Sequence, residues 1–228
     1  MKIKYRPEID GLRAISVFLI IIYHANLSIN GIKLFPGGFI GVDIFFVISG
    51  YLISSILLRE KQTTGQINLL NFYNRRARRL IPCLSVVSIA TIFFSVTYIV
   101  PYISLDTIKS IFSANFFIAN FYFFFTGQAY GEPSSLLKPF LHTWSLGVEE
   151  QFYIIFPILL IFLFKVFKNN ILNFFVLIFF ISFFSSNFIS NTNVSLSFYM
   201  IFSRAWEIIF GVIIGLRNFD SLKIKQET

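Results

Sequence analysis

Long apolar runs alternate with short polar segments along this chain. Seven runs approach the ~20 mostly apolar residues that a helix needs to cross ~30 Å of hydrocarbon. They are Ala14–Ile29, Phe39–Leu58, Pro82–Val100, Ile108–Phe125, Leu146–Phe164, Ile171–Ile189 and Phe198–Leu216. We therefore predict an all-α fold, a polytopic bundle of transmembrane helices that forms one membrane domain over residues 1–228.

Basic residues next to these runs predict how the chain crosses the membrane, because Lys and Arg accumulate in cytoplasmic segments. The basic clusters are Lys2, Lys4, Arg6 and Arg13, the connection Arg59–Arg79, the pair Lys165 and Lys168, and Arg217, Lys223 and Lys225. Both ends of the chain are therefore predicted to be cytoplasmic. Acidic Glu8 and Asp10, and the lack of a small-residue cleavage site, argue against a cleaved signal peptide at the N-terminus.

Three apolar runs lie between the cytoplasmic residues Arg79 and Lys168, yet only an even number of crossings fits between them. One run must therefore fail to cross. The run Ile108–Phe125 is interrupted by Asn115 and Asn120. Irregular backbone at membrane depth survives only where protein or water covers it. We expect a re-entrant or interfacial segment there, and about six crossings in all.

Composition excludes several classes of protein. Hydrophobic residues make up 56% of the chain and charged residues 13%, about half the charge typical of a soluble domain. The single cysteine, Cys83, excludes an internal disulfide framework and a cysteine-rich metal site. The net charge of +8 comes from residues beside apolar runs, so it indicates membrane topology rather than a nucleic-acid partner. No metal is predicted.

Ionisable residues inside apolar runs are costly and are therefore candidates for function. Arg13 and His24 share one helix face, roughly 16 Å apart along the axis. The alternative is that Arg13 is a snorkelling interface anchor and His24 a helix-end residue among lipid headgroups. Asp43 should face a cavity or a cation. Ser49 and Gly50 would let a neighbouring helix pack closely, which explains them better than catalysis does.

The connection Arg59–Arg79 ends in a cluster of four arginines, Arg75, Arg76, Arg78 and Arg79. Arginine binds phosphate through a planar fork and is favoured over lysine where phosphate geometry matters. The cluster therefore indicates a phosphorylated cytosolic ligand. Attraction to anionic lipid headgroups is the alternative.

The segment Leu141–Tyr153 leads into an apolar run and carries His142, Trp144 and the adjacent acids Glu149 and Glu150. The two acids point 100° apart on a helix, so we expect one to face a site and the other to pair elsewhere. The simpler alternative is that both acids lie at the start of a helix, where negative charge interacts favourably with the helix dipole. Later, Arg204 and Glu207 place opposite charges three residues apart in an apolar helix, where they can compensate each other.

Taken in order, these motifs resemble the N-terminal part of the acyltransferase-3 family, membrane enzymes that O-acylate bacterial surface polysaccharides. The matching segments are Tyr5–Ala14, the Arg13 to His24 spacing, Phe45–Tyr51, Arg75–Pro82, His142–Tyr153 and Arg204–Glu207. The resemblance implies transfer of an acyl group, acetyl above all, from cytosolic acyl-CoA to a hydroxyl of a cell-surface glycan such as lipopolysaccharide. It also implies a multi-pass protein of the bacterial inner membrane whose partners are membrane lipid and the glycan acceptor.

The resemblance implies that Arg13 and His24 are essential. The position of Glu149 and Glu150 at the start of an apolar run adds these two acids to the predicted catalytic set. The four arginines Arg75, Arg76, Arg78 and Arg79 are expected to bind acetyl-CoA or another acyl-CoA. Substrate contact or structural support is expected from Asp10, Asp43, His142, Trp144, Ser145 and Glu207. His24 can act as general base or carry the acyl group covalently, and the sequence leaves both open.

Family members continue for several more membrane spans, whereas this sequence stops at Thr228 shortly after a helix. A truncated product is therefore expected. Two other functions fit the same sequence: a transporter or flippase of an acyl or glycan carrier, since transporters also contain buried charges and interrupted helices, and an inactive remnant.

Overall fold

The computed structural model describes residues 6–30, 32–95, 97, 105–127, 138–167 and 170–227, with side chains as far as Phe219. Two compact units form from segments that alternate along the chain. One contains residues 1–67, 163–182 and 205–228, and the other contains residues 68–162 and 183–204. Some sequence predictions fall outside the described residues or side chains, namely those on Lys2, Lys4, Lys168, Lys223, Lys225 and the Val100 end of the third apolar run.

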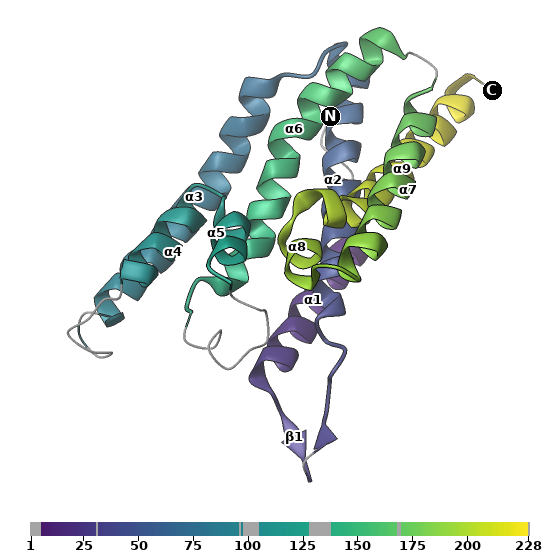
Figure 1. Ribbon diagram of the computed structural model, residues 1–228. Helices are drawn as coiled ribbons and strands as arrows, with labels where there is room; N and C mark the ends of the chain where they lie inside the picture. The colour runs from purple at the N-terminus through teal and green to yellow at the C-terminus, as the bar shows by residue number, and fades with distance from the viewer. Residues whose placement is uncertain are drawn as a thin grey trace. The chain divides into compact units, whose positions relative to one another are not determined.

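Helices account for nearly all of the described chain (Figure 1). In the first unit these are α1 (Pro7–Ala25) and α2 (Ile40–Thr64), joined by a short hairpin of β1 (Ser28–Ile29) and β2 (Ile32–Lys33). The second unit contains α3 (Leu69–Phe94), α4 (Leu105–Asn115), α5 (Ala119–Phe125), η3 (Leu141–Thr143), most of α6 (Trp144–Val166) and α8 (Val194–Tyr199). Helices α7 (Ile171–Ser190) and α9 (Ile201–Glu227) contribute residues to both units.

Five helical stretches in the described chain are long and apolar enough to cross a membrane. They are Ile40–Thr64, Leu69–Phe94, Leu141–Val166, Ile171–Ser190 and Val194–Phe219. Helix α1 is nearly as long, at 19 residues, but its first turns carry Glu8, Asp10 and Arg13. The predicted class, a helical membrane bundle, is confirmed, and the chain is a multi-pass membrane protein.

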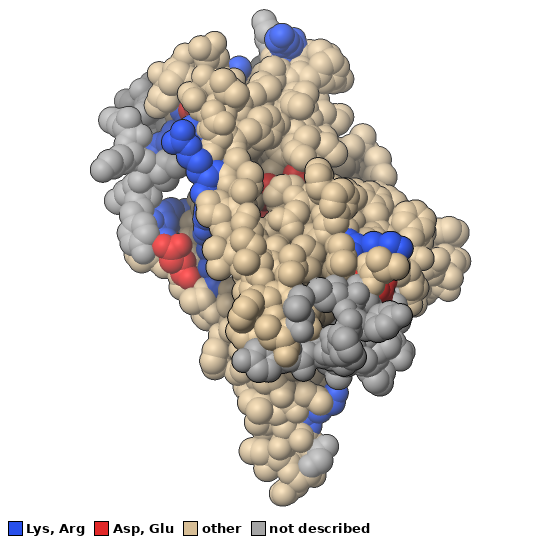
Figure 2. Space-filling view, turned by 90° about the vertical axis from the view of Figure 1, so that its left-hand side faces the viewer, with Lys and Arg blue, Asp and Glu red and all other residues tan. Residues whose placement is uncertain are grey.

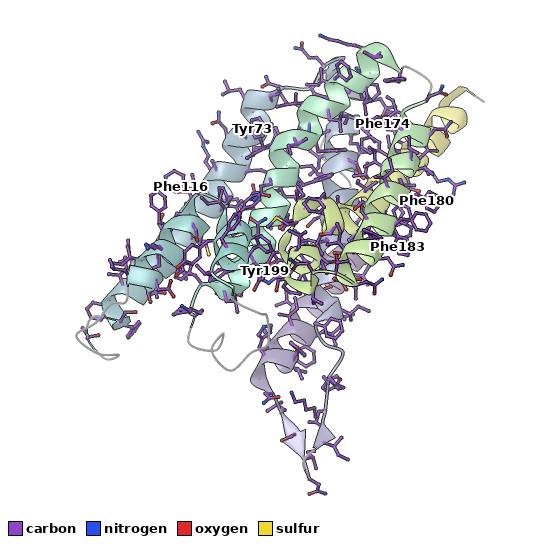
Figure 3. The ribbon with its side chains drawn as sticks, in the orientation of Figure 1. Tyr73, Phe116, Phe174, Phe180, Phe183 and Tyr199 are labelled. Atoms are coloured by element: carbon purple, nitrogen blue, oxygen red, sulfur yellow. The ribbon has the colours of Figure 1, made fainter. Side chains whose placement is uncertain are left out.

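The molecular surface agrees with this class. Most of the face shown in Figure 2 belongs to residues other than Lys, Arg, Asp and Glu. Phe116, Phe180 and Phe183 are labelled in Figure 3, and their side chains are 61%, 48% and 42% exposed. Large exposed aromatic side chains are expected where the solvent is lipid rather than water.

Glycines bring α2 into close contact with two other helices of the first unit. A β carbon at Gly41 would overlap the Ser16 carbonyl oxygen of α1, and one at Gly38 would lie 2.6 Å from the Leu19 carbonyl oxygen. On another face of α2, a β carbon at Gly50 would overlap the Ile208 carbonyl oxygen of α9. Small residues allow such backbone contact between membrane helices, so the structural role predicted for Gly50 is confirmed.

The prediction that the arginines lie in a polar connection is wrong. Helix α2 continues to Thr64 and α3 begins at Leu69, so the whole arginine cluster is helical. The Asn68 side chain caps α3 by accepting a hydrogen bond from the Asn71 backbone N–H at 2.9 Å. From Leu69 to Ile81 the chain contains neither Gly nor Pro, and Arg, Leu and Ala favour the helix.

The interrupted run folds into a helical hairpin, as predicted for a segment that does not cross. Helix α4 has 11 residues and α5 has 7, which gives lengths of only ~16 Å and ~10 Å. Between them Phe117 adopts a left-handed conformation with φ of 57°. The Tyr122 hydroxyl donates to Asp106, so α5 returns alongside α4.

Contact with α3 indicates how deep this hairpin reaches. Asn115, at the end of α4, donates to the Ser88 hydroxyl at 2.9 Å. Ser88 lies in the apolar half of α3, about 13 Å of helix beyond Arg79. The turn of the hairpin therefore lies within the apolar depth of α3, which is the geometry of a re-entrant segment.

The last predicted run, Phe198–Leu216, is also interrupted. Helix α8 ends at Tyr199, Met200 is extended with ψ of 140°, and α9 begins at Ile201. The Ser203 hydroxyl lies 2.8 Å from the carbonyl oxygens of both Met200 and Ser197 and can donate its hydrogen to either. Such side-chain hydrogen bonds satisfy carbonyl groups that the break leaves outside the helical ladder.

Cysteine labelling tests the predicted sidedness. Gln66 is exposed in the connection between α2 and α3, and Asn193 is exposed before α8. In a Cys83→Ala background, which removes the exposed native thiol, an impermeant maleimide added to intact cells should label Asn193→Cys and not Gln66→Cys. The basic residues flanking Gln66 are the reason, because they are retained in the cytoplasm. Permeabilised cells should label both variants, and the reverse pattern in intact cells would overturn the topology.

Candidate functional site

His24 lies in the last turn of α1 and is exposed. Its Nδ1 is 2.8 Å from the Ile20 carbonyl oxygen. A carbonyl oxygen only accepts, so Nδ1 carries the hydrogen and Nε2 carries the lone pair. The ring also packs edge-on against Tyr23, with centroids 5.3 Å apart. The backbone contact therefore selects the tautomer with the lone pair on Nε2.

Arg13 lies beside the middle of the apolar part of α2. Its guanidinium carbon is 5.6 Å from the centre of the Phe45 ring, and Phe45 is about 21 Å of helix away from Arg59 at the basic end of α2. Arg6 also lies beside the apolar part of α2 rather than at its basic end, because the Arg6 Nη1 donates to the Tyr51 hydroxyl at 2.6 Å. Arg13 therefore does not lie where an arginine that anchors the basic end of α2 in the headgroup region would lie.

The other candidates in this unit lie at different levels along α1 and α2. Asp10 is exposed in the first turn of α1. Asp43 is half-buried in the first turn of α2, two positions before Phe45, so it is at the level of Arg13. His24 and Arg13 remain roughly 16 Å apart along α1, too far for direct contact.

A cluster of charged residues joins α3 to α6 in the second unit. Arg76 forms an ion pair with Glu150, and its Nε donates to Glu150 Oε2 at 3.3 Å. The Arg76 guanidinium carbon also lies 3.7 Å from the centre of the Tyr153 ring. The Tyr153 hydroxyl in turn donates to Glu149 Oε1 at 2.5 Å. We call Arg76, Glu149, Glu150 and Tyr153 the carboxylate cluster.

The carboxylate cluster is largely withdrawn from the protein surface. Glu149 is 7% exposed, Glu150 6% and Tyr153 3%. A buried carboxylate needs a cation or several hydrogen bonds, since desolvating it alone costs several kcal/mol. Arg76 supplies a cation to Glu150, and the Tyr153 hydroxyl supplies a hydrogen bond to Glu149.

The four arginines therefore differ in position. Arg76 is half-buried and paired with Glu150, whereas Arg75, Arg78 and Arg79 are exposed on α3. Exposed arginines on one helix can meet a ligand from outside, and Arg75 and Arg78 share a face because they are three residues apart. The geometry assigns Arg76 to the interior of the second unit and leaves three arginines at its surface.

Aromatic packing surrounds the start of α6. Trp144 is 2% exposed and packs on Phe198 and Tyr199, with centroids 4.3 and 5.9 Å away. The Arg204 guanidinium carbon lies 5.6 Å from the centre of the Trp144 ring. A cation over the face of a tryptophan is a favourable contact. It explains why both residues occur in an apolar region.

The remaining predicted support residues have separate surroundings. His142 is exposed in η3, and the Ser145 hydroxyl donates to its carbonyl oxygen at 3.2 Å. Glu207 is buried in the part of α9 that belongs to the first unit, with 1% exposure. Among the described residues no group of three or more His, Cys, Asp or Glu side chains is arranged to hold a metal ion.

Sequence reasoning missed two polar residues of the second unit, the buried Tyr153 and the half-buried Gln151, and did not predict the partners of Asn120. Gln151 Nε2 donates to Asn120 Oδ1 at 2.8 Å and to the Phe117 carbonyl oxygen at 2.9 Å. Asn120 Nδ2 donates to the Tyr199 carbonyl oxygen at 3.1 Å. The two amides thus satisfy carbonyl groups at both helix breaks. Tyr153 could have been found from its i+4 spacing to Glu149.

Comparison with known proteins gives one consistent result. The acyltransferase-3 family model, described as an acyltransferase domain, matches residues 6–224. The chain is 42% identical over 169 residues to a peptidoglycan O-acetyltransferase, OatA, of Listeria monocytogenes, with 73% of this chain and 26% of the relative aligned. It is 39% identical over 165 residues to the O-acetyltransferase OatA of Staphylococcus aureus strain NCTC 8325, with 72% of this chain and 26% of the relative aligned.

A putative O-acetyltransferase of S. aureus strain MSSA476 is 42% identical over 170 residues, which are 74% of this chain and 27% of that protein. The chain thus spans about a quarter of the length of the relatives it matches. No solved structure matches. Since the match to the family model runs through α1, the carboxylate cluster and most of α9, the chain belongs to the acyltransferase-3 family.

Proposed function

We propose that this protein transfers an acyl group, most simply acetyl, from acyl-CoA in the cytosol to a hydroxyl group of a cell-surface glycan. The observation that carries the proposal is the family match over residues 6–224, which includes His24, the arginines of α3 and the carboxylate cluster. The chain is proposed to lie in the bacterial cytoplasmic membrane with its N-terminus inside.

The donor side of the proposal rests on α3. Arg75, Arg78 and Arg79 are exposed close to the start of that helix. Coenzyme A carries phosphate groups, which guanidinium groups bind through paired hydrogen bonds. Positive charge next to an apolar span also favours the cytoplasmic side, where acyl-CoA is found.

The acceptor side rests on His24. It lies at the end of α1 that meets the start of α2, whereas Arg59 and Lys61 occupy the other end of α2. A histidine at the outer side can accept the proton of an attacking sugar hydroxyl near neutral pH. The Listeria relative's name specifies peptidoglycan, so peptidoglycan is the acceptor we propose in preference to lipopolysaccharide.

Complementation tests the proposed function directly. The gene product is expressed in a bacterium that lacks its own peptidoglycan O-acetyltransferase, and acetate released from purified cell wall by mild base is measured. Restored base-labile acetate supports the proposal. The proposal is contradicted if the protein is abundant in the membrane fraction but neither peptidoglycan nor other surface glycans contain base-labile acetate.

A transporter of an acyl or glycan carrier is the second candidate, and the two interrupted helical segments favour it. Breaks between α4 and α5 and between α8 and α9 resemble the discontinuous helices at transporter binding sites. Purified protein in vesicles distinguishes the two functions. Label that crosses the membrane and is never transferred to a sugar would support the transporter.

Conservative substitution of the arginines tests the donor site. Arg75→Lys and Arg78→Lys should each raise the donor KM roughly tenfold, because losing paired hydrogen bonds to phosphate costs about 1.5 kcal/mol even when the charge stays. The KM is measured with labelled acyl-CoA and purified enzyme, and Arg79→Lys shows whether the third exposed arginine also binds phosphate. Unchanged KM values in all three variants would mean that the arginines serve topology or lipid contact.

A further inference from the structure

A groove of about 510 Å³ lies between the two helices of the re-entrant hairpin, in the second unit. Its lining is mainly apolar and includes Phe112, Ile118, Phe121 and Phe125. Lys109 and Thr126 also line it, mainly with the apolar atoms of their side chains. The catalytic and donor residues proposed above contribute nothing to this groove, so it needs an explanation of its own.

The groove has a defined direction relative to the membrane. One end of the groove lies near the turn of the hairpin, where Asn115 contacts Ser88 in the apolar half of α3. Lys109 lies about 9 Å of helix away from Asn115, toward the beginning of α4. Thr126 follows the end of α5, on the same side. The end of the groove at Lys109 and Thr126 therefore points away from the Arg75–Arg79 end of α3, and the end at the hairpin turn points into the hydrocarbon.

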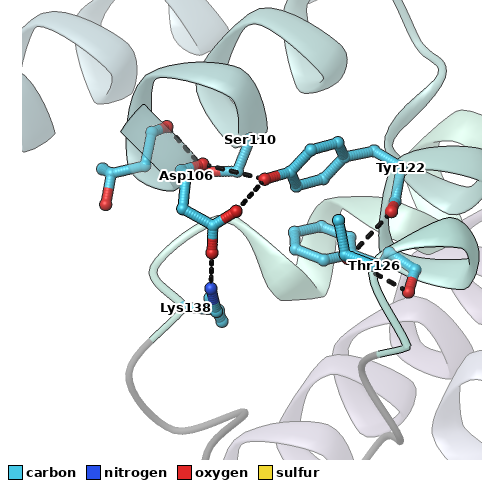
Figure 4. A network of polar contacts seen from close by, with 7 residues as sticks. Asp106, Ser110, Tyr122, Thr126 and Lys138 are labelled. Carbon is cyan, nitrogen blue, oxygen red and sulfur yellow. Dashed lines mark hydrogen bonds and ion pairs between the residues drawn. The ribbon is translucent and has the colours of Figure 1, made fainter. Parts of the chain in front are cut away.

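A polar network fixes one wall of the groove (Figure 4). The Tyr122 hydroxyl donates to the Asp106 carboxylate and also contacts the Asp106 carbonyl oxygen at 3.1 Å. Lys138 forms an ion pair with the same carboxylate. The charge of Asp106 is thus balanced by Lys138, which leaves the positive charge of Lys109 uncompensated by this network.

Lys109 supplies the charge that selects an occupant. Its side chain is exposed, and within the part of the chain that the structure describes no carboxylate forms an ion pair with it. A lysine at headgroup level attracts anionic lipid with an energy of about 1 kcal/mol. The aromatic Phe125, 78% exposed, is also of the type found at the interface between lipid and water.

We propose that the groove binds an anionic phospholipid of the leaflet opposite the Arg75–Arg79 end of α3. One acyl chain lies along Phe112, Ile118 and Phe121, and the phosphate contacts the Lys109 ammonium group. The direction of the groove matches that of a lipid, with the charged group outward and the chain inward. The bound lipid covers apolar surface of a hairpin that is too short to span the membrane.

Lipid retention by the purified protein tests this site. The full chain is equilibrated in mixed micelles of phosphatidylglycerol and phosphatidylcholine, and each retained lipid is quantified by native mass spectrometry. Lys109→Gln should lower phosphatidylglycerol retention roughly fivefold, the equivalent of ~1 kcal/mol, and leave phosphatidylcholine unchanged. Lys109→Arg should retain the wild-type value. Lys165→Gln, at an exposed lysine near the end of α6, is the matched control.

A second variant tests the position of the chain. Ile118→Trp places a bulky ring in the groove and should lower retention of both lipids, while gel filtration and thermal unfolding check that the variant is folded. Wild-type phosphatidylglycerol retention in Lys109→Gln, or in folded Ile118→Trp, would overturn the proposal. Competition by a prenyl phosphate but not by phosphatidylglycerol would also overturn it, in favour of a carrier lipid. None of these outcomes depends on acyl transfer, so the proposed function is tested separately.

Discussion

His24→Ala is expected to lower glycan acylation by about 10²- to 10⁴-fold, the range that a general base contributes. The Nδ1 hydrogen bond to the Ile20 carbonyl oxygen keeps the lone pair on Nε2, where an attacking hydroxyl can transfer its proton. Alanine removes that base and leaves the helix intact, because it has the highest helix propensity. The same loss is expected if His24 carries the acyl group covalently.

The measurement is base-labile acetate in purified cell wall, normalised to the amount of protein in the membrane fraction. Ile21→Ala is the matched control, since Ile21 is on the same helix and is 59% exposed. Its acylation should equal that of the wild type. Normal acylation by His24→Ala at equal abundance would remove His24 from the mechanism.

Labelling without an acceptor distinguishes the two roles of His24. With radiolabelled acyl-CoA alone, a covalent carrier acquires label that His24→Ala loses. A general base acquires none, because it exchanges only a proton with the acceptor. Label that persists in His24→Ala would show an acyl group carried by another residue.

Arg76→Ala is expected to destabilise the protein by about 3–5 kcal/mol, because removing one partner of a buried ion pair leaves an uncompensated charge. Without Arg76, the Glu150 carboxylate, whose side chain is 8% exposed, would lose its ion pair. For a chain of this size the loss corresponds to a fall in Tm of about 10 °C. Thermal unfolding in detergent, followed by tryptophan fluorescence, measures it.

Arg75→Ala is the matched control, because Arg75 is the neighbouring arginine on α3 and is exposed. Its Tm should change by no more than about 2 °C. The double variant Arg76→Leu/Glu150→Leu should recover most of the lost stability, since apolar residues often replace a buried ion pair without penalty. If Arg76→Ala unfolds at the same temperature as Arg75→Ala, the ion pair does not stabilise the fold. A double variant that is stable but inactive would indicate that Arg76 and Glu150 take part in the reaction.

The helical membrane fold could be predicted because the thickness of the bilayer sets the length of the apolar runs and the membrane sets where the charged residues lie. The interruption of Ile108–Phe125 was visible in Asn115 and Asn120, and these are the residues that contact Ser88 and the Tyr199 carbonyl oxygen. The close approach at Gly50 was visible as well, since only small residues permit it. Each of these predictions depends on one residue type in one local context.

The errors came from competing local signals. Four arginines within five positions indicate a polar connection, but helix propensity and the Asn68 cap make them part of α3. The break at Met200 carries no Gly or Pro and gave no signal. Its carbonyl groups are satisfied by Ser203 and by Asn120, which comes from a distant part of the chain.

The candidate site could be predicted only as a set of residues, because pairing across the chain has no local signature. Glu149 and Glu150 were expected to diverge, and the structure pairs Glu150 with Arg76 and Glu149 with Tyr153. Which acid meets which partner depends on how α3 packs on α6. The catalytic roles of Arg13, His24 and the two acids remain predictions for the experiments above.

The glycine contacts between α1 and α2 have a consequence for how the protein is made. Helix α1 begins with Glu8, Asp10 and Arg13, so by itself it partitions poorly into lipid. Its contacts are completed by α2 and by the turn before it, where Gly41 and Gly38 allow the α1 backbone to approach closely. We therefore expect α1 to remain at the translocon until α2 has been synthesised. The two helices should then enter the bilayer together as a hairpin. A ribosome that stalls between them would leave α1 outside the membrane.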